Sequence, residues 1–210
     1  MTDHQVVMTD EVSRLANATR ASNAPKEVTE QVRELSAQAR VLLDEHTWPG
    51  PYAVEQLAPP GDGMLVWEPE DLRKTVPYSP ILGELNPIAG AVKLWADGNV
   101  VRGTIKARPI HAGPLGLVHG GIVAAILDEL SSLAVLAFGV VGYPQTLTVS
   151  YRLPTPLGAE LELWAQTSGP TGNVVLTSAE IRHAGRVTAS AVGVHKAAGR
   201  RDEPVYHVKP

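Results

Sequence analysis

Residues 118–139 read VHGGIVAAILDELSSLAVLAFG, a His-Gly-Gly turn directly followed by an apolar run. Apolar residues surround the predicted helix on all sides, and a helix of this kind is normally buried. Asp128 and Glu129 interrupt the run, which is also shorter than the ~20 residues that a membrane-spanning helix needs. The stretch therefore predicts a long buried helix from about Gly120 to Phe138, and no membrane span.

The start of this helix combines hydrogen-bond donors with a carboxylate. The free N–H groups at a helix N-terminus bind oxyanions, and the paired glycines Gly120 and Gly121 let another group approach the backbone closely. Asp128 lies about 700° around the helix from Gly121, and so on nearly the same face. Burial perturbs the pKa of such an acid, which makes it a candidate site residue, whereas we expect Glu129 to be solvent-facing or paired. This combination is typical of acyl transfer to water; a plain turn before a helix is the alternative interpretation.

Around this helix the hydrophobic pattern changes to a period of two, which is typical of strands. VKLWA, ending in Asp97-Gly98, and the following VVRGTIKARPI predict a hairpin with a tight turn. After the helix, four more strands are predicted at 146–153, 159–167, 173–183 and 186–196. The sequence thus predicts six strands, with the helix between the second and the third.

Two stretches carry a resemblance to a known family. HAGPLGLVHGGIVAAILDE (111–129) resembles the opening of the central helix in hotdog-fold acyl-CoA thioesterases of the phenylacetate-pathway and THEM-type branch, within the 4-hydroxybenzoyl-CoA thioesterase-like superfamily. LTVSYRLPTPLGAELEL (147–163) resembles the next strand of that family and its Pro-x-Pro-Leu-Gly turn. The resemblance covers roughly residues 80–196. It implies an α+β hotdog fold, an antiparallel sheet of about six strands wrapped around one long central helix.

The resemblance also implies a reaction, the hydrolysis of an acyl-CoA thioester to a free acid and CoA. In this branch the Gly120 N–H would donate to the thioester carbonyl. Asp128, contributed by the second subunit of an obligate homodimer or a tetramer, would act as general base or as nucleophile. His119 would fix the turn or polarise the carbonyl. No cofactor and no metal is expected.

Four further residues are expected to contact the substrate: Gly121, His111, Thr146 and Arg152. The resemblance implies that His111 lines the entrance to the site. It also implies a hydroxyl residue ahead of the strand, but that position falls near Pro144 and Gln145 in this chain, and Thr146 is the nearest substitute. A loop histidine without a role and an ordinary strand threonine are the alternative interpretations.

Other functions have less support in the sequence. A non-catalytic acyl-CoA-binding or scaffold hotdog protein, using the acidic N-terminal extension to bind a partner, is the alternative function. A Gly-x-Ser-x-Gly motif is absent, which argues against an α/β-hydrolase serine esterase. The chain has no cysteine and no His-x-x-x-His cluster, so a metal site has no basis. The net charge of -4 gives no attraction to nucleic acid.

Charge and composition divide the chain. Residues 1–80 hold 7 Lys/Arg against 13 Asp/Glu, whereas residues 81–210 hold 11 against 9 and suit an anionic ligand such as coenzyme A better. We expect an N-terminal extension over 1–79, with a disordered stretch (1–24), a helix (25–48) and an irregular arm (49–79). The hotdog domain then spans 80–198, before a tail over 199–210. The N-terminus lacks the pattern of a secretory signal, so a cytoplasmic location is expected.

Overall fold

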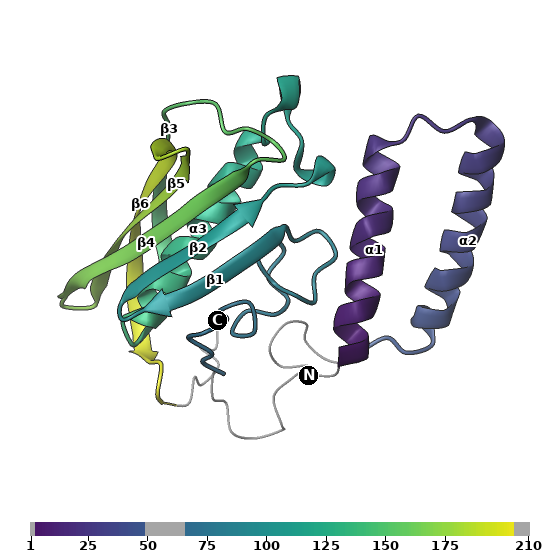
Figure 1. Ribbon diagram of the computed structural model, residues 1–210. Coiled ribbons are helices and arrows are strands. Elements are labelled where there is room, and N and C mark those ends of the chain that lie inside the picture. Colours follow the sequence, from purple (N-terminus) through teal and green to yellow (C-terminus); the bar gives the residue numbers. More distant parts are fainter. Residues whose placement is uncertain (1–2, 49–65, 204–210) are drawn as a thin grey trace.

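Six antiparallel strands form one sheet in the order β1-β2-β4-β5-β6-β3 (Figure 1). The computed structural model describes residues 3–48 and 66–203. The strands are β1 (Ala91–Asp97), β2 (Val100–Lys106), β3 (Val140–Tyr151), β4 (Glu160–Thr171), β5 (Val174–His183) and β6 (Arg186–Arg200). Two short 3-10 turns, η2 (Pro109–His111) and η3 (Pro114–Gly116), follow β2. The six strands and their order along the chain confirm the sequence prediction, including the β1–β2 hairpin.

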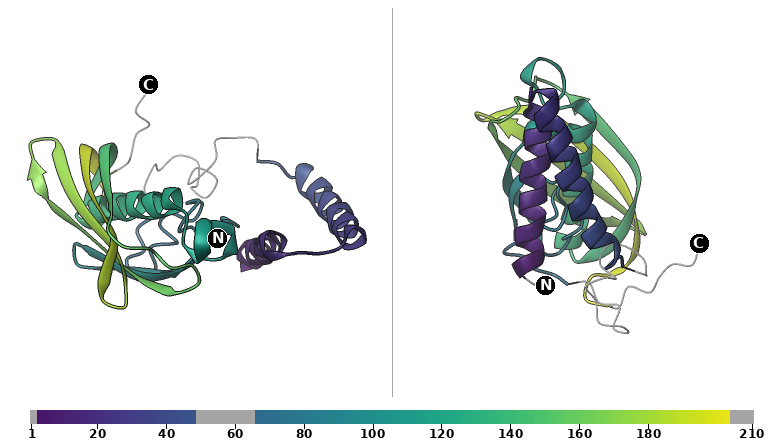
Figure 2. Two further views of the ribbon diagram at one scale, coloured as in Figure 1. Left: turned by 90° about the horizontal axis from the view of Figure 1, so that it is seen from above. Right: turned by 90° about the vertical axis from the view of Figure 1, so that its right-hand side faces the viewer.

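The long helix α3 (Gly120–Ala137) lies inside the curve of the sheet (Figures 1 and 2). Its buried residues are Val123, Ile126, Leu127, Leu130, Ser131, Leu133, Ala134 and Val135. By length and composition α3 could also cross a membrane, but in this fold it is the core helix of the sheet. The predicted α+β hotdog fold, a sheet wrapped around one helix, is therefore confirmed.

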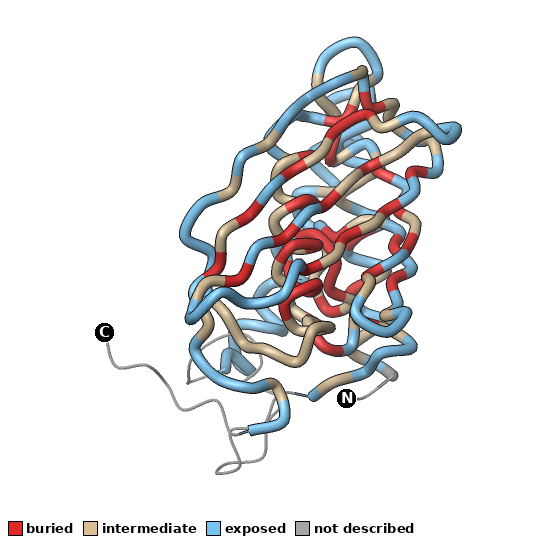
Figure 3. The backbone as a smooth tube through the Cα atoms, turned by 90° about the vertical axis from the view of Figure 1, so that its left-hand side faces the viewer, coloured by how far each residue is buried: buried red, intermediate tan, exposed pale blue. Residues whose placement is uncertain are grey.

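Burial alternates along the strands because one face of the sheet packs on α3. In β4, Leu161, Leu163 and Ala165 are buried, whereas the alternating residues Glu160 and Glu162 are exposed. Figure 3 shows the same alternation as red and pale blue segments along neighbouring strands. The apolar and polar positions of the sequence thus decide which side of each strand meets the helix.

The residues before β1 cover one edge of the sheet. The Leu72 N–H donates to the Leu94 carbonyl at 3.0 Å, and the Ala96 N–H donates to the Pro69 carbonyl at 2.8 Å. Leu72 is fully buried. The described part of the predicted irregular arm is therefore packed on the main domain; residues 49–65 of that arm lie outside the described residues.

The N-terminal extension corrects one sequence expectation. Where composition predicts a disordered stretch over 1–24, the structure has the helix α1 (Asp3–Ala21). Small polar side chains hold α1 on the domain: the Arg108 side chain donates to the Ser13 hydroxyl at 2.7 Å, and the Ile110 N–H donates to the Asn17 side chain at 3.2 Å. Because polar side chains make these contacts, the hydrophobic pattern of the sequence does not predict them.

The second helix of the extension, α2 (Lys26–Asp44), follows the predicted helix over 25–48. None of its residues is buried, and α2 projects away from the domain (Figure 2). At the other end of the chain, β6 runs into the expected tail as far as Arg200. Residues 204–210 of that tail lie outside the described residues.

Candidate active site

The His-Gly-Gly turn forms the N-terminus of α3 and leaves one amide free. His119 is the N-cap, and its ring Nδ1 accepts a hydrogen bond from the Gly121 N–H at 3.0 Å. The amides of Ile122 and Val123 donate to the His119 carbonyl. Among the described residues, no acceptor pairs with the Gly120 N–H. Because the dipole of α3 adds positive charge at this end, the exposed Gly120 amide is a ready donor for an oxyanion.

His111 supports this turn from the interior. Its backbone carbonyl accepts from the His119 N–H at 2.9 Å, and its ring is buried, at 4% exposure. The ring Nδ1 accepts from the Arg108 N–H at 3.0 Å, and Nε2 lies 2.6 Å from the Ile88 carbonyl. A carbonyl only accepts, so the proton is on Nε2, and burial lowers the pKa of the ring. Both ring nitrogens are used within the chain, and a place for His111 at the entrance to the site stays a prediction.

Asp128 and Glu129 lie two turns into α3 and are half-buried. Burial raises the pKa of Glu129, a hydrogen bond with the Ser79 side chain lowers it, and the Asp128 charge raises it again. Of the two alternatives that the sequence leaves for Glu129, solvent-facing or paired, this contact favours the paired one. Asp128 comes eight residues after Gly120, and at ~1.5 Å per residue the two lie about 12 Å apart along the helix axis. One thioester carbonyl cannot reach the Gly120 amide and the Asp128 carboxylate of the same chain.

The remaining predicted contacts lie on the outer side of β3. The strand has a bulge between Pro144 and Thr146, after which Leu147 packs on the core and Thr146, opposite Val194, is exposed. Arg152 is also exposed, and its Nε donates to the Ser190 hydroxyl at 3.1 Å. Within one chain, neither Thr146 nor Arg152 is brought together with the start of α3.

Comparison with known proteins shows what the chain is similar to. The chain aligns with a crystal structure of a thioesterase superfamily protein at a TM-score of 0.70 and 27% identity, over 90% of this chain and 93% of the other. The chain is a hotdog-fold thioesterase homologue. Human acyl-coenzyme A thioesterase 13 is 23% identical over 120 residues, which are 56% of this chain and 81% of that protein.

Two further comparisons cover shorter stretches of the hotdog homologue. The Xenopus laevis acyl-coenzyme A thioesterase THEM4 is 34% identical over 76 residues, 35% of this chain and 33% of that protein. A Streptococcus mutans structure bound to acetyl CoA shares the fold at a TM-score of 0.50 and 16% identity, over 53% of this chain and 91% of the other. No profile of a known protein family matches the chain.

Two residues near the candidate site of this thioesterase homologue were missed by the sequence analysis. Tyr151, at the end of β3, donates its hydroxyl to the Gly120 carbonyl at 2.9 Å and so ties the edge strand to the start of α3. His195, in β6, is fully buried, and neither ring nitrogen has a partner among the described residues. Burial lowers the pKa of His195, and the charge of Asp128 opposes that shift. The Tyr151–Gly120 contact and the influence of Asp128 on His195 join distant parts of the chain, so no local sequence signal predicts them.

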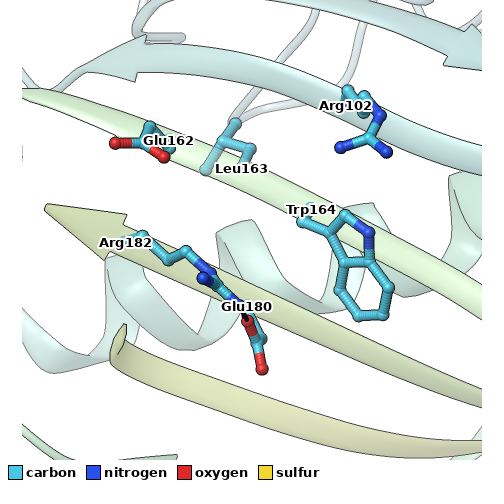
Figure 4. Close-up of a pocket in the computed structure, with 6 residues that line it drawn as sticks. All are labelled: Arg102, Glu162, Leu163, Trp164, Glu180 and Arg182. Carbon is cyan, nitrogen blue, oxygen red and sulfur yellow. Dashed lines mark hydrogen bonds and ion pairs between the residues drawn. The ribbon is translucent and has the colours of Figure 1, made fainter. Parts of the chain in front are cut away.

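A hollow of the hotdog homologue lies on the outer face of the sheet, away from α3. It has a volume of about 330 Å³, and Figure 4 shows its lining residues: Arg102, Glu162, Leu163, Trp164, Glu180 and Arg182. Arg182 donates twice to Glu180, and Arg102 pairs with Asp97 at 3.1 Å. Among the described residues, no group of three or more His, Asp or Glu is arranged to hold a metal ion. The start of α3 is therefore the candidate active site.

Proposed function

We propose that this protein hydrolyses acyl-CoA thioesters at a site shared by two copies of the chain. The observation that carries the proposal is the free Gly120 amide at the N-terminus of α3, about 12 Å along the helix from the only carboxylate of that face. A second copy facing the first can bring its own Asp128 to the Gly120 amide. The similarity to acyl-coenzyme A thioesterases supports the same chemistry.

In this reaction the thioester carbonyl accepts a hydrogen bond from the Gly120 N–H of one subunit. Asp128 of the other subunit takes a proton from water as the water oxygen attacks the carbonyl carbon, or the carboxylate attacks directly. The negative charge that forms on the carbonyl oxygen is stabilised by the Gly120 amide and the helix dipole. The C–S bond then breaks, and the leaving thiolate takes the proton from Asp128. After direct attack, water hydrolyses the anhydride between the acyl group and Asp128 and supplies the proton for the thiolate.

The open edge of the sheet supports an obligate pair. Over Val140–Tyr151 the described backbone of β3 pairs only with β6, and Tyr143 and Tyr151 are 48% and 58% exposed. An unpaired strand edge with apolar surface favours pairing with another strand. The face of α3 that carries Asp128 is only half-buried in the single chain. A second copy paired along β3 would cover both.

The first test is a hydrolysis screen over aliphatic and aromatic acyl-CoA esters, with release of the free thiol as the readout. We expect Asp128→Asn to lower turnover by at least ~100-fold while the protein stays folded and paired. Glu129→Gln is the matched control and should change turnover much less. Sensitivity of Glu129 with an insensitive Asp128 would refute the assignment. Tight acyl-CoA binding without hydrolysis in the native protein would favour the scaffold alternative instead.

The shared site has its own test, which uses two inactive variants. Asp128→Asn and Gly120→Ala chains are unfolded together and refolded as a mixture. In a mixed pair, one of the two sites combines an intact Gly120 with an intact Asp128, so random mixing should restore about a quarter of the native activity. If each chain held a complete site, no mixed pair would be active. Absence of restored activity in verified mixed pairs would therefore refute the shared site.

A further inference from the structure

The helix α2 has no partner in the single chain. A helix of 19 residues draws most of its stability from the packing of an apolar face, yet none of its residues is buried. Leu35 and Leu42 are 64% and 70% exposed. A cavity of about 480 Å³ separates α1 from α2, between Leu15 on α1 and Val28 and Val32 on α2. The helices α1 and α2 form a helical hairpin, and they therefore do not cover each other's apolar side chains.

The apolar residues of both helices have the spacing of a coiled-coil seam. They recur at alternating intervals of four and three, which is the a and d pattern of heptads. We call them the hairpin seam: Met8, Val12, Leu15, Val28, Val32, Leu35, Ala39 and Leu42. In this heptad register, every charged residue of α2 falls at the b, c or f positions, on the far side from the seam. A helix with this division presents one wide uncharged face to other helices.

The charges of α2 leave this face free for self-association. Lys26 pairs with Glu30 at 3.6 Å, Arg33 with Glu34 at 3.7 Å, and Arg40 with Asp44, all within the helix. The residues that flank the seam on α2 are Thr29, Gln31, Ser36, Gln38 and Leu43. None of them is charged, so two identical helices can approach each other without repulsion between like charges.

The exposed area also fits a second copy. Six large side chains of the hairpin seam are 41% to 70% exposed. They offer roughly 400 Å² of apolar surface on each hairpin, or about 800 Å² between two. This is close to the apolar share of a protein interface of standard size. A pair of hairpins meeting seam to seam is also self-complementary, as a two-fold interface requires.

We propose that the α1–α2 hairpin packs against the same hairpin of a second copy, forming a four-helix bundle that joins two pairs of subunits. Figures 1 and 2 show the hairpin on the side of the domain beyond η2, away from β3. The bundle and the β3 contact therefore use different surfaces. Each pair formed along β3 carries two hairpins, so the bundle doubles the size of the assembly.

The test is Leu35→Glu, with Ala37→Glu as the matched control. Both substitutions add one negative charge to an exposed position of α2, but Ala37 lies among the charged positions outside the seam. Because α2 has no buried residue, neither change disturbs the core of the domain. Mass is measured by sedimentation velocity at micromolar concentration, and helix content by circular dichroism.

We expect Leu35→Glu to halve the mass of the assembly and Ala37→Glu to leave it unchanged, with the same thioester hydrolysis per chain in all three proteins. An unchanged mass for Leu35→Glu would overturn the proposal, as would an equal loss of mass for Ala37→Glu. Mass is read independently of turnover. A native protein without hydrolysis would refute the proposed function and leave this test intact.

Discussion

The substitution Gly120→Ala adds a single methyl group to the His-Gly-Gly turn, and we expect different effects on stability and on turnover. A Cβ added at Gly120 would meet the Tyr151 ring at 3.7 to 3.8 Å, which is ordinary van der Waals contact. Gly120 is in the first turn of α3, where alanine is the better helix former. We expect the free energy of unfolding of Gly120→Ala to stay the same or to rise by up to ~1 kcal/mol. The melting temperature should then rise by no more than about 4 °C.

The same methyl group obstructs the proposed reaction. A carbonyl oxygen bound to the Gly120 N–H must lie ~2.9 Å from its nitrogen, beside the position that the new Cβ fills. Loss of one such donor costs about 100- to 1,000-fold in kcat. The variant should therefore be as stable as the native protein and at least ~100-fold slower.

The assay pairs a thermal melt with steady-state thiol release. Gly199→Ala is the matched control, because a Cβ there meets nothing within 4 Å, and it should change neither quantity. Full activity in Gly120→Ala would refute a substrate bound at this amide. A large loss of stability would refute the packing of Tyr151 against the turn.

Two other predictions concern stability. Burial lowers the pKa of His111 and His195, so the folded state favours their neutral forms. The stability that the two neutral side chains contribute is complete above about pH 6.5, and it is lost as the pH falls below that value. His195→Leu should flatten the fall of the melting temperature between about pH 6.5 and 5, and an unchanged slope would contradict this. Removal of residues 1–79 takes away the buried Leu72 and should lower the melting temperature by several degrees, whereas removal of residues 1–24 should leave turnover unchanged. Equal melting temperatures for the full chain and the 80–210 fragment would contradict the first part.

The parts of the fold that the sequence predicts are those held by apolar periodicity. The period of α3 and the alternation of the strands depend on contact with one shared core, so each segment carries its own signal. The hairpin turn at Asp97-Gly98 is equally local. The helix α1 is held on the domain in a different way, since its buried residues Thr9 and Ser13 are small and polar and give no apolar period.

The candidate site was predicted in part for the same reason. His119 and Gly120 lie within one turn, so the cap and the start of the helix can be predicted from adjacent residues. The ring of His111 is fixed by the Ile88 carbonyl, which lies 23 residues earlier in the chain, and only the fold brings the two together. The bulge between Pro144 and Thr146 is visible only in the pairing of β3 with β6. Alternation along one strand cannot reveal it.

The covered edge of β1 has a consequence for how large the sheet can grow. A sheet with two open edges can add subunits at both ends, and repeated addition produces a fibre of unlimited length. Here the backbone of residues 69–72 occupies hydrogen-bonding positions along β1. A strand of another chain can then be added only beside β3. Once β3 of one chain pairs with β3 of a second chain, neither chain has an unpaired edge strand left. The segment before β1 thus makes edge pairing stop at two chains.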